Sequence, residues 1–405
     1  MQTIDTGSTA WVLAASALVL FMTLPGLALF YGGLIRARNF LSMLMHCFAI
    51  CCIASLIWAV FGYSLAFSDG GGLIGGFGKA FLAGLGGAPG MHIPEIVFAL
   101  FQMTFAIITS ALIVGAFAER VRFPFVLLFS ALWLVIVYLP VAHLVWGGGW
   151  AARAHVFDFA GGIVVHTTAG VSALVAAILI GARSGFPHHL IPPHSPGMTM
   201  AGAGMLWVGW FGFNGGSALA ADASAGYAIM ATHLAAAAAA MSWMVIEWLR
   251  VGKPTSIGLV TGAVAGLATI TPASGYVGPM GAIALGIAGG TVCFFATNLI
   301  KQRFRIDDTL DVFAVHGVGG IAGSILVAIL AMPALGGVGF AAGMGPGRQL
   351  LVQIVTVAGV ALWSVVATFV LIKLIGAVTR PRVGREQEIE GLDLVTHGER
   401  AYDLT

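Results

Sequence analysis

The chain has 405 residues, of which 59% are hydrophobic and only 8% are charged. Soluble domains carry roughly 25% charged residues, so this composition excludes an ordinary soluble protein. The formal net charge of +2 gives no reason to expect a nucleic-acid partner, because the basic residues are spread among the loops.

The apolar residues fall into runs of about 20, the length that crosses a bilayer as a helix, whereas the alternating strands of a membrane barrel are absent. We therefore predict an all-α polytopic membrane protein with eleven transmembrane helices. In chain order the predicted spans are residues 9–34, 41–67, 94–118, 124–145, 160–182, 198–219, 226–249, 256–272, 278–300, 311–332 and 348–377. The 57 glycines fit this class, because small residues let helices pack closely in lipid. The sequence divides into a membrane domain, residues 1–378, and a tail, residues 379–405.

The basic residues predict the orientation of the chain. The segments RAR, ERVR, RSGFPHH, RVGK and KQRFR between spans, together with the tail, place 15 of the 18 Lys and Arg on one side. Only Lys79, Arg153 and Arg348 fall on the opposite side. The positive-inside rule then puts the N-terminus outside and the C-terminus in the cytoplasm. The first nine residues contain no Lys or Arg, so either no signal peptide is present or it has been removed.

Two halves of the chain resemble each other. The first span ends in LALFYGG and the sixth contains WFGFNGGS, while the fifth and tenth both carry an aspartate eight residues before a histidine and a glycine four residues after it. Spans 1–5 and 6–10 therefore form a predicted inverted repeat, since an odd number of spans reverses the second copy. In transporters such repeats place the substrate path at their interface, near the middle of the membrane.

The repeated histidines, His166 and His316, are the sharpest feature. Ionisable residues inside a span are costly and mark an ion or substrate path by default. The repeat puts both at equivalent depth, where two neutral rings share one hydrogen bond and titrate as a coupled unit. The structural alternative is a pair of satisfied polar groups that tie helices together. The two histidines could instead be axial ligands of haem, but two haems held between the same helices would need two pairs of histidines. His46, His143 and His233 do not have the spacing to supply them, so a haem site is disfavoured.

Aspartates precede both histidines. Asp158 opens the fifth span, where it is expected to cap the helix, and its ionised form would also stabilise a cation arriving nearby. Capping is likewise expected of Asp307, Asp308 and Asp311 before the tenth span.

Aromatic residues gather where the outer ends of spans are expected. Their faces stabilise a cation by about 0.5–2 kcal/mol, although an interfacial belt or ordinary packing is the structural alternative. Ser217, one turn beyond Phe213, either faces the same site or bonds its own helix backbone. The residues of this group are Trp146, Phe101, Phe105, Phe213, Tyr138 and Ser217.

Other candidate ligands are expected to be structural. His188, His189 and His194 lie in the loop RSGFPHHLIPPHSPG, which is expected to be solvated, with a metal site as the alternative. Cysteines inside apolar runs behave as small hydrophobes, and those of this chain are Cys47, Cys51, Cys52 and Cys293. We expect no metal and no cofactor.

The sequence closely resembles the ammonium transporter family (Amt/Mep), of the bacterial type, which is related to the Rhesus proteins. The resemblance covers nearly the whole chain. It rests on PGLALFYGGLIRARN, FQMTFAIIT, GAFAERVRF, HLVWGGGW, DFAGGIVVH, GWFGFNGGS, TPASGYVG, DVFAVHGVGG and EGLDLVTHGERAYD.

The resemblance implies a role for each candidate residue. It implies an outer recruitment site of Trp146, Phe105 and Ser217, with Phe101 and Tyr138 beside it. It implies a gate at Phe105 and Phe213, and it makes His166 and His316 the paired pore histidines. It gives Asp158 the role of an essential buried acid.

The resemblance also implies an assembly and a function. It implies a homotrimer in the inner (cytoplasmic) membrane, regulated by a PII-type signalling protein at its cytoplasmic face. The expected function is transport of ammonium, with methylammonium as an analogue: the cation is recruited outside, deprotonated, and crosses as ammonia along the histidines, with or without a proton. The chain is expected not to be an enzyme. The alternatives are an ammonium sensor with little flux and an electrically neutral ammonia channel, but the tail carries no output domain, which favours transport.

Overall fold

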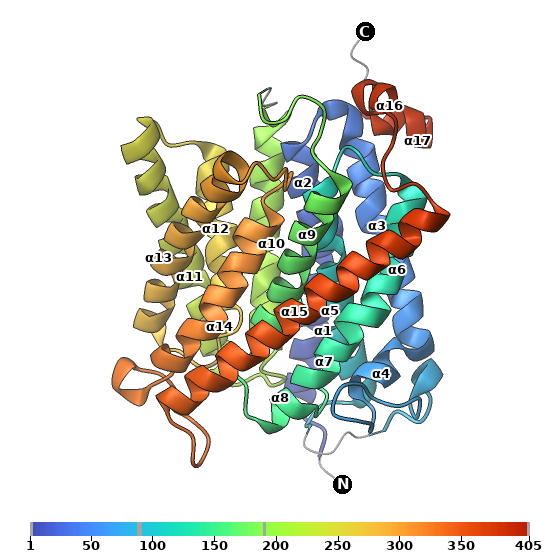
Figure 1. Cartoon of the computed structure of the whole chain (residues 1–405). Helices are drawn as coiled ribbons and strands as arrows, with labels where there is room; N and C mark the ends of the chain where they lie inside the picture. Colours follow the sequence, from blue (N-terminus) through green and yellow to red (C-terminus); the bar gives the residue numbers. More distant parts are fainter. Residues whose placement is uncertain (1–2, 87–90, 189–191, 403–405) are drawn as a thin grey trace.

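The computed structural model describes residues 3–86, 91–188 and 192–402, and over these residues the regular structure is helical, without a β-strand. Two isolated β-bridges are present, Gly70–Gly75 and Val121–Arg382. The bundle is built from long helical segments, several of them assembled from consecutive α-, π- and 3-10 turns (Figure 1).

Nine helical segments of the described chain are long and apolar enough to cross a membrane. They are Thr6–Leu34 (containing α1 and α2), Ala37–Phe67 (α3 and α4), Glu95–Phe117 (α5), Phe123–Arg153 (α6, α7 and α8), Gly162–Ile180 (η7 and α9), Ala223–Val251 (α11), Pro279–Arg303 (α13), Phe313–Leu330 (η9 and α14) and Pro346–Val378 (α15). These nine confirm the prediction of an all-helical membrane protein.

The two remaining predicted spans are also helical. The sixth corresponds to α10, Pro196–Gly216, and the eighth to α12, Ser256–Ile270. α12 has only 15 residues, and neither helix is among the nine segments above. Each of the eleven predicted ranges therefore falls on a helix.

Local sequence signals set where several of these helices begin. Side-chain oxygens of Asp5, Ser195, Asp222 and Thr255 accept backbone N–H groups in the first turns of α1, α10, α11 and α12. Such N-caps satisfy donors that have no partner inside the helix.

The helices pack side by side, with one exception. α15 runs obliquely across α6, α9 and α14 (Figure 1). Elsewhere glycines allow close approach: a Cβ on Gly202 of α10 would lie 2.8 Å from the carbonyl oxygen of Gly26. Close backbone contact of this kind is a main source of helix association in lipid.

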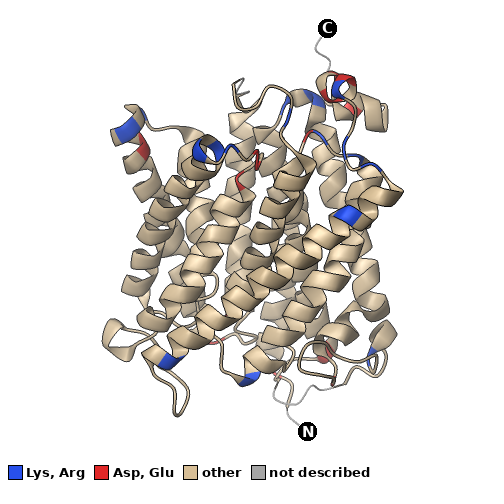
Figure 2. Ribbon diagram, in the orientation of Figure 1, with Lys and Arg blue, Asp and Glu red and all other residues tan. Residues whose placement is uncertain are grey.

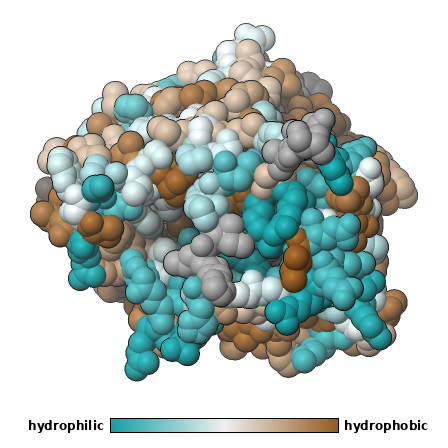
Figure 3. Space-filling model, turned by 90° about the horizontal axis from the view of Figure 1, so that it is seen from above, coloured by the Kyte–Doolittle hydropathy of each residue, from teal (hydrophilic) through white to brown (hydrophobic). Residues whose placement is uncertain are grey.

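The two ends of the chain lie at opposite faces of the bundle (Figure 1). We call the lower face in Figure 1 the N-terminal face and the upper one the C-terminal face. Most Lys and Arg residues gather at the C-terminal face (Figure 2), where hydrophilic side chains cover much of the surface (Figure 3). This distribution agrees with the charge asymmetry predicted from the loops.

The tail packs against the C-terminal face through α16, Arg385–Glu390, and α17, Leu392–His397. Asp393 accepts the backbone N–H groups of Leu41 (3.0 Å) and Ser42 (2.7 Å), and so caps α3, Phe40–Ile57. Glu388 accepts the N–H of Ser184 at 2.6 Å. The tail is therefore hydrogen-bonded to two loops of the membrane domain.

Candidate functional site

His166 and His316 meet in the middle of the bundle. His166 lies on a π-helical turn, η7 (Gly162–Thr167), and His316 on another, η9 (Phe313–Gly317). Both rings are buried, their Nδ1 atoms are 3.3 Å apart, and the ring planes are inclined by only 21°. Short π-helical turns inside helices often mark functional sites.

The glycine four residues after each histidine has a direct steric role. A Cβ on Gly320 would lie 2.6 Å from the Cβ of His166, and a Cβ on Gly170 would overlap the backbone of Gly317, next to His316. Each glycine thus gives the histidine segment of the other half room to approach.

Thr271 fixes the direction of the hydrogen bonds through the pair. Its hydroxyl lies 2.7 Å from the carbonyl oxygen of Leu267, which can only accept, so the single hydroxyl proton goes there. The same oxygen accepts Trp210 Nε1–H at 2.9 Å and lies 3.2 Å from His166 Nε2, which must therefore donate. In neutral rings, His166 Nδ1 is then the acceptor and His316 Nδ1 the donor.

Two aromatic rings pack against each other beside the histidines. The centroids of Phe105 and Phe213 lie 4.2 Å apart with the ring planes inclined by 30°, and both side chains are buried. Phe213 lies 6.2 Å from the His166 ring. A narrow apolar cavity of about 10 Å³ lies beside both histidines, with Phe213, Trp210 and Phe30 in its wall. Such a volume holds about one water-sized molecule.

Two further aromatic candidates, Phe101 and Trp146, contact Phe105. Phe101 meets Phe105 edge-on at 5.0 Å, and Trp146 meets Phe105 edge-on at 5.8 Å. Tyr138 is fully buried, and its hydroxyl has no hydrogen-bond partner in the described structure. Ser217 is partly exposed and donates to the carbonyl oxygen of Phe213 at 2.9 Å, which is the backbone bond named as its alternative role.

Asp158 caps the segment that carries His166, as predicted. Its Oδ1 accepts the N–H of Gly161 at 3.1 Å, and its Oδ2 accepts those of Ile163 and Val164, each at 3.0 Å. Its carbonyl oxygen accepts Trp146 Nε1–H at 2.9 Å. Burial raises the pKa of Asp158 to about 6 against the opposing effect of these N–H groups, so the carboxylate is the main form at neutral pH.

The aspartates of the other half behave differently, and part of the prediction for them is wrong. Asp308 accepts the N–H of Phe313 at 2.7 Å and is a cap. Asp307 is not a cap, because it pairs with Arg183 at 2.8 Å. Asp311 has a φ of +59° and pairs with Lys301 at 2.7 Å. Arg183 comes from a distant segment and Lys301 from the helical turn just before this loop, and the spacing before His316 gave no sign of either.

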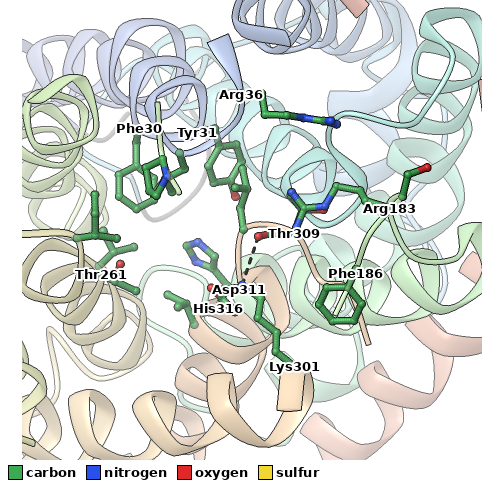
Figure 4. Close-up of a pocket in the computed structure, with 17 residues that line it drawn as sticks. Phe30, Tyr31, Arg36, Arg183, Phe186, Thr261, Lys301, Thr309, Asp311 and His316 are labelled. Carbon is green, nitrogen blue, oxygen red and sulfur yellow. Dashed lines mark hydrogen bonds and ion pairs between the residues drawn. The ribbon is translucent and has the colours of Figure 1, made fainter. Parts of the chain in front are cut away.

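A second cavity, of about 240 Å³, opens from His316 toward the C-terminal face (Figure 4). Arg36, Arg183 and Lys301 line its mouth, while Phe30 and Tyr31 line its deeper part. Sequence reasoning identified none of these five residues as part of the site.

Buried ion pairs support that mouth. Glu119 accepts Arg36 Nε and Arg183 Nη1, both at 2.7 Å, and Arg183 Nη2 donates to Asp307 at 2.8 Å. Burial alone would raise the pKa of Glu119, but Arg183 and Arg36 hold it below its usual value. The motif GAFAERVRF indicated the orientation and the family resemblance, but not that its carboxylate joins three loops.

The structure also bears on the exposure expected of the loop histidines and on the haem alternative. His194 is partly buried, with Nδ1 2.8 Å from the carbonyl oxygen of Ile35, so the expectation of a solvated side chain is wrong for it. His188 is exposed, and His189 lies outside the described residues. The 3.3 Å between the two Nδ1 atoms does not fit a haem, because axial ligands on opposite sides of an iron, each about 2 Å from it, would place their nitrogens about 4 Å apart.

Comparisons with known proteins identify the family of the chain. The family model described as "Ammonium Transporter Family" matches residues 10–402. The ammonium transporter of Bacillus subtilis (strain 168) is 46% identical over 405 residues, covering 98% of both chains. Ammonium transporter Amt1 of Archaeoglobus fulgidus is 45% identical over 398 residues, covering 98% of this chain and 99% of that one.

Solved structures show the same fold. A structure named "Sensor Amt Protein" superposes with a TM-score of 0.91 at 31% identity, covering 96% of this chain and 98% of that one. Candida albicans Mep2 superposes with a TM-score of 0.87 at 35% identity, covering 95% and 88%. The chain belongs to the ammonium transporter family, as its sequence motifs predicted, and is a multi-pass membrane protein.

Proposed function

We propose that this protein carries ammonium nitrogen across the inner (cytoplasmic) membrane, from the N-terminal face to the C-terminal face. The observation that carries the proposal is the buried histidine pair, which is flanked by the ring of Phe213 and by the cavity that opens toward the C-terminal face. Eleven spans in an inverted repeat, with the N-terminus outside, account for the opposite chain ends and for the asymmetry of basic residues.

Recruitment is the first step. Ammonium binds outside at Trp146, Phe105 and Ser217, with Phe101 and Tyr138 in the surrounding wall. Cation–π contact replaces part of its lost hydration, and the carboxylate of Asp158 adds negative potential. The gain is about 0.5–2 kcal/mol per aromatic contact, enough to concentrate the cation at the entrance but not to carry it through an apolar pore.

Deprotonation follows at the gate. The closely packed rings of Phe105 and Phe213 and the small apolar cavity beside the histidines favour a neutral molecule of about the size of water. Ammonium therefore gives up a proton and crosses as ammonia, and the proton follows along His166 and His316. Selectivity results directly, since a potassium ion has no proton to give up.

Before ammonia passes the histidine pair, His316 donates from Nδ1 to His166, as the hydrogen bonds through Thr271 require. The lone pair of His316 Nε2 is free to accept a hydrogen bond, and His316 lines the cavity toward the C-terminal face. Ammonia that leaves the pair can be reprotonated in that cavity, among water and the polar groups at its mouth.

Assembly and regulation complete the proposal. The protein forms a homotrimer with one pore per subunit, and a PII-type protein binds its C-terminal face. The docked tail, which hydrogen-bonds to Ser184 beside Arg183 of the cavity mouth, supports a regulatory role for residues 379–405.

Purified protein in liposomes tests the proposal. An inward ammonium gradient should produce an inward current and methylammonium uptake, both absent from protein-free liposomes. Uptake without current would favour the neutral ammonia channel. Saturable ammonium binding without flux would favour a sensor, the reading suggested by the similar structure named "Sensor Amt Protein".

A further inference from the structure

His143 makes two hydrogen bonds that a neutral histidine cannot make together. It lies in the last turn of α7, Leu139–Val145, and is buried. Its Nδ1 is 2.9 Å from the carbonyl oxygen of Ala66, and its Nε2 is 2.9 Å from that of Gly71. Carbonyl oxygens only accept, so both ring nitrogens must carry hydrogen.

We propose that His143 is a doubly protonated positioning residue, an imidazolium that holds the turn carrying Trp146 in place for ammonium recruitment. This role rests on the proposed function, in which Trp146 receives the cation.

The other paired histidines show that this arrangement is unusual within the described chain. His166 and His316 face each other, so one ring donates and the other accepts. His194 donates from Nδ1 to Ile35, while its Nε2 lies 3.2 Å from the hydroxyl of Tyr402, which can itself donate. Neither arrangement requires a positive ring.

The surroundings of His143 favour a cation. The residue sits at the C-terminal end of α7, and Ala66 belongs to the last turn of α4, Tyr63–Phe67. Both helix ends carry partial negative charge, which stabilises a nearby cation. The charged residues on neighbouring elements are Asp69 in the same loop, Arg153 on α8, whose guanidinium lies against Gly72, and Asp158 before η7. The other titratable side chains on elements packed against α7 are Tyr63, Tyr138 and His166. Both ring nitrogens already face carbonyl oxygens, so no carboxylate pairs with them.

Several contacts couple His143 to Trp146. The carbonyl oxygen of His143 accepts the N–H groups of Gly147 (2.9 Å) and Gly149 (3.0 Å), which closes the turn after Trp146. A Cβ on Gly147 would overlap the carbonyl oxygen of Ala66 and lie 2.7 Å from His143 Nδ1. The turn therefore rests directly on the bond between the ring and Ala66.

A second link joins the same two segments further along. The N–H of Trp150 donates to the carbonyl oxygen of Gly72 at 3.2 Å. The loop after α4 and the turn after α7 thus move as one unit while the ring keeps both bonds.

Nitrogen NMR reads the protonation state directly. Protein labelled with ¹⁵N-histidine is measured at pH 7, and the His143 signals are assigned by their loss in His143→Gln. Two protonated ring nitrogens are expected. One protonated and one bare nitrogen would overturn the proposal. This result depends on no transport activity, so it stands whether or not the proposed function holds.

Transport kinetics test the positioning role. Both N–H donors of glutamine are on one nitrogen, so its side chain cannot replace the donors on the two ring nitrogens. His143→Gln should therefore raise the KM for methylammonium about three- to tenfold, the effect of one lost hydrogen bond, with little change in maximal rate. His155→Gln is the control, because that ring is exposed after α8 and makes no side-chain hydrogen bond in the described structure. It should leave KM unchanged. Equal KM values for wild type and His143→Gln, or a loss confined to maximal rate, would overturn the role. If the wild-type protein shows no uptake at all, the proposed function fails, and the NMR result alone decides the charge of His143.

Discussion

Nδ1 of His166 and Nδ1 of His316 lie 3.3 Å apart, and Thr271 determines which of them donates. The Thr271 hydroxyl is committed to Leu267, so His166 must donate from Nε2 and accept at Nδ1. The buried pair therefore has one preferred direction, although its two rings are chemically identical.

Replacing Thr271 by valine should remove the preference for one direction of the hydrogen bond between His166 and His316. Valine has the same shape but leaves His166 Nε2 and Trp210 Nε1 without an acceptor, a cost of about 1–3 kcal/mol for each buried group. Both tautomers of the pair should then be seen in ¹⁵N spectra, and methylammonium uptake should fall roughly tenfold. Thr269→Val is the control, because the Thr269 hydroxyl bonds only its own helix, at Ala265. A single, unchanged tautomer in Thr271→Val would contradict this reading.

The Asp158 carboxyl should make recruitment sensitive to outside pH. Its pKa is raised to about 6, so it is ionised above that pH and neutral below it. The KM for methylammonium should therefore rise as outside pH falls through about 6, because the negative potential is lost while the substrate stays protonated. Asp158→Asn should show weak uptake at every pH.

Asp308→Asn is the matched variant for that test, since Asp308 holds the equivalent place in the second half of the chain. It should alter uptake from outside much less than Asp158→Asn does. Equal losses in the two variants would mean that both aspartates act only as helix caps.

Glycine at position 170 should be required for the two halves to meet. Alanine there would overlap the backbone of Gly317, so Gly170→Ala should destabilise the protein by about 1–3 kcal/mol or more. Gly204→Ala on α10 has no heavy atom within 4 Å of the added Cβ. It should be neutral or stabilising by about 0.5–1 kcal/mol, as for other glycines inside helices. Thermal unfolding in detergent measures both, and similar melting temperatures for the two variants would contradict the packing argument.

The ion pairs at the cavity mouth should make the protein less stable in acid. Burial raises the pKa of Glu119 and Asp307, but Arg183 and its neighbours hold both below their ordinary values of 4.5 and 3.8. A depressed folded-state pKa gives stability that is fully present above the ordinary pKa and is lost as pH falls through the depressed one. The melting temperature should therefore be insensitive to this cluster from pH 7 to about 5 and should fall below about 4.

Glu119→Gln isolates that contribution. It should cost about 3 kcal/mol at pH 7, because Arg36 and Arg183 lose a buried partner, and it should flatten the acid dependence. Glu399→Gln, in the exposed end of the tail, should change neither quantity. An acid profile of Glu119→Gln that matches the wild type would show that other carboxylates control acid unfolding.

The sequence predicted those features that repeat along the chain. Each predicted apolar run falls on a helix, and nine helical segments of the described chain are long and apolar enough to cross a membrane. Equal spacing around His166 and His316 indicated two segments in equivalent positions. It did not reveal partners that only folding brings together. No local sequence pattern marks Thr271 or Lys301. They belong to the site because the fold brings Thr271 to His166 and Lys301 to Asp311. The π-helical turns under both histidines likewise depend on tertiary packing rather than on local propensity.

The errors have the same origin. Asp307 and Asp311 have the residue type and position of helix caps, yet Arg183 and Lys301 bind them from other loops. His194 looked like a polar loop residue, but the tail brings Tyr402 to its ring.

The central claim is that the histidine pair passes the proton that ammonium leaves behind. Currents from liposomes on ammonium and potassium gradients test it most directly, with wild-type protein compared with a variant in which both histidines are leucine. Wild type should carry an ammonium current and no potassium current. In the double variant, either the ammonium current should fall at least about tenfold, or the current should no longer be selective for ammonium over potassium. An unchanged, selective current in the double variant would show that His166 and His316 do not carry the proton.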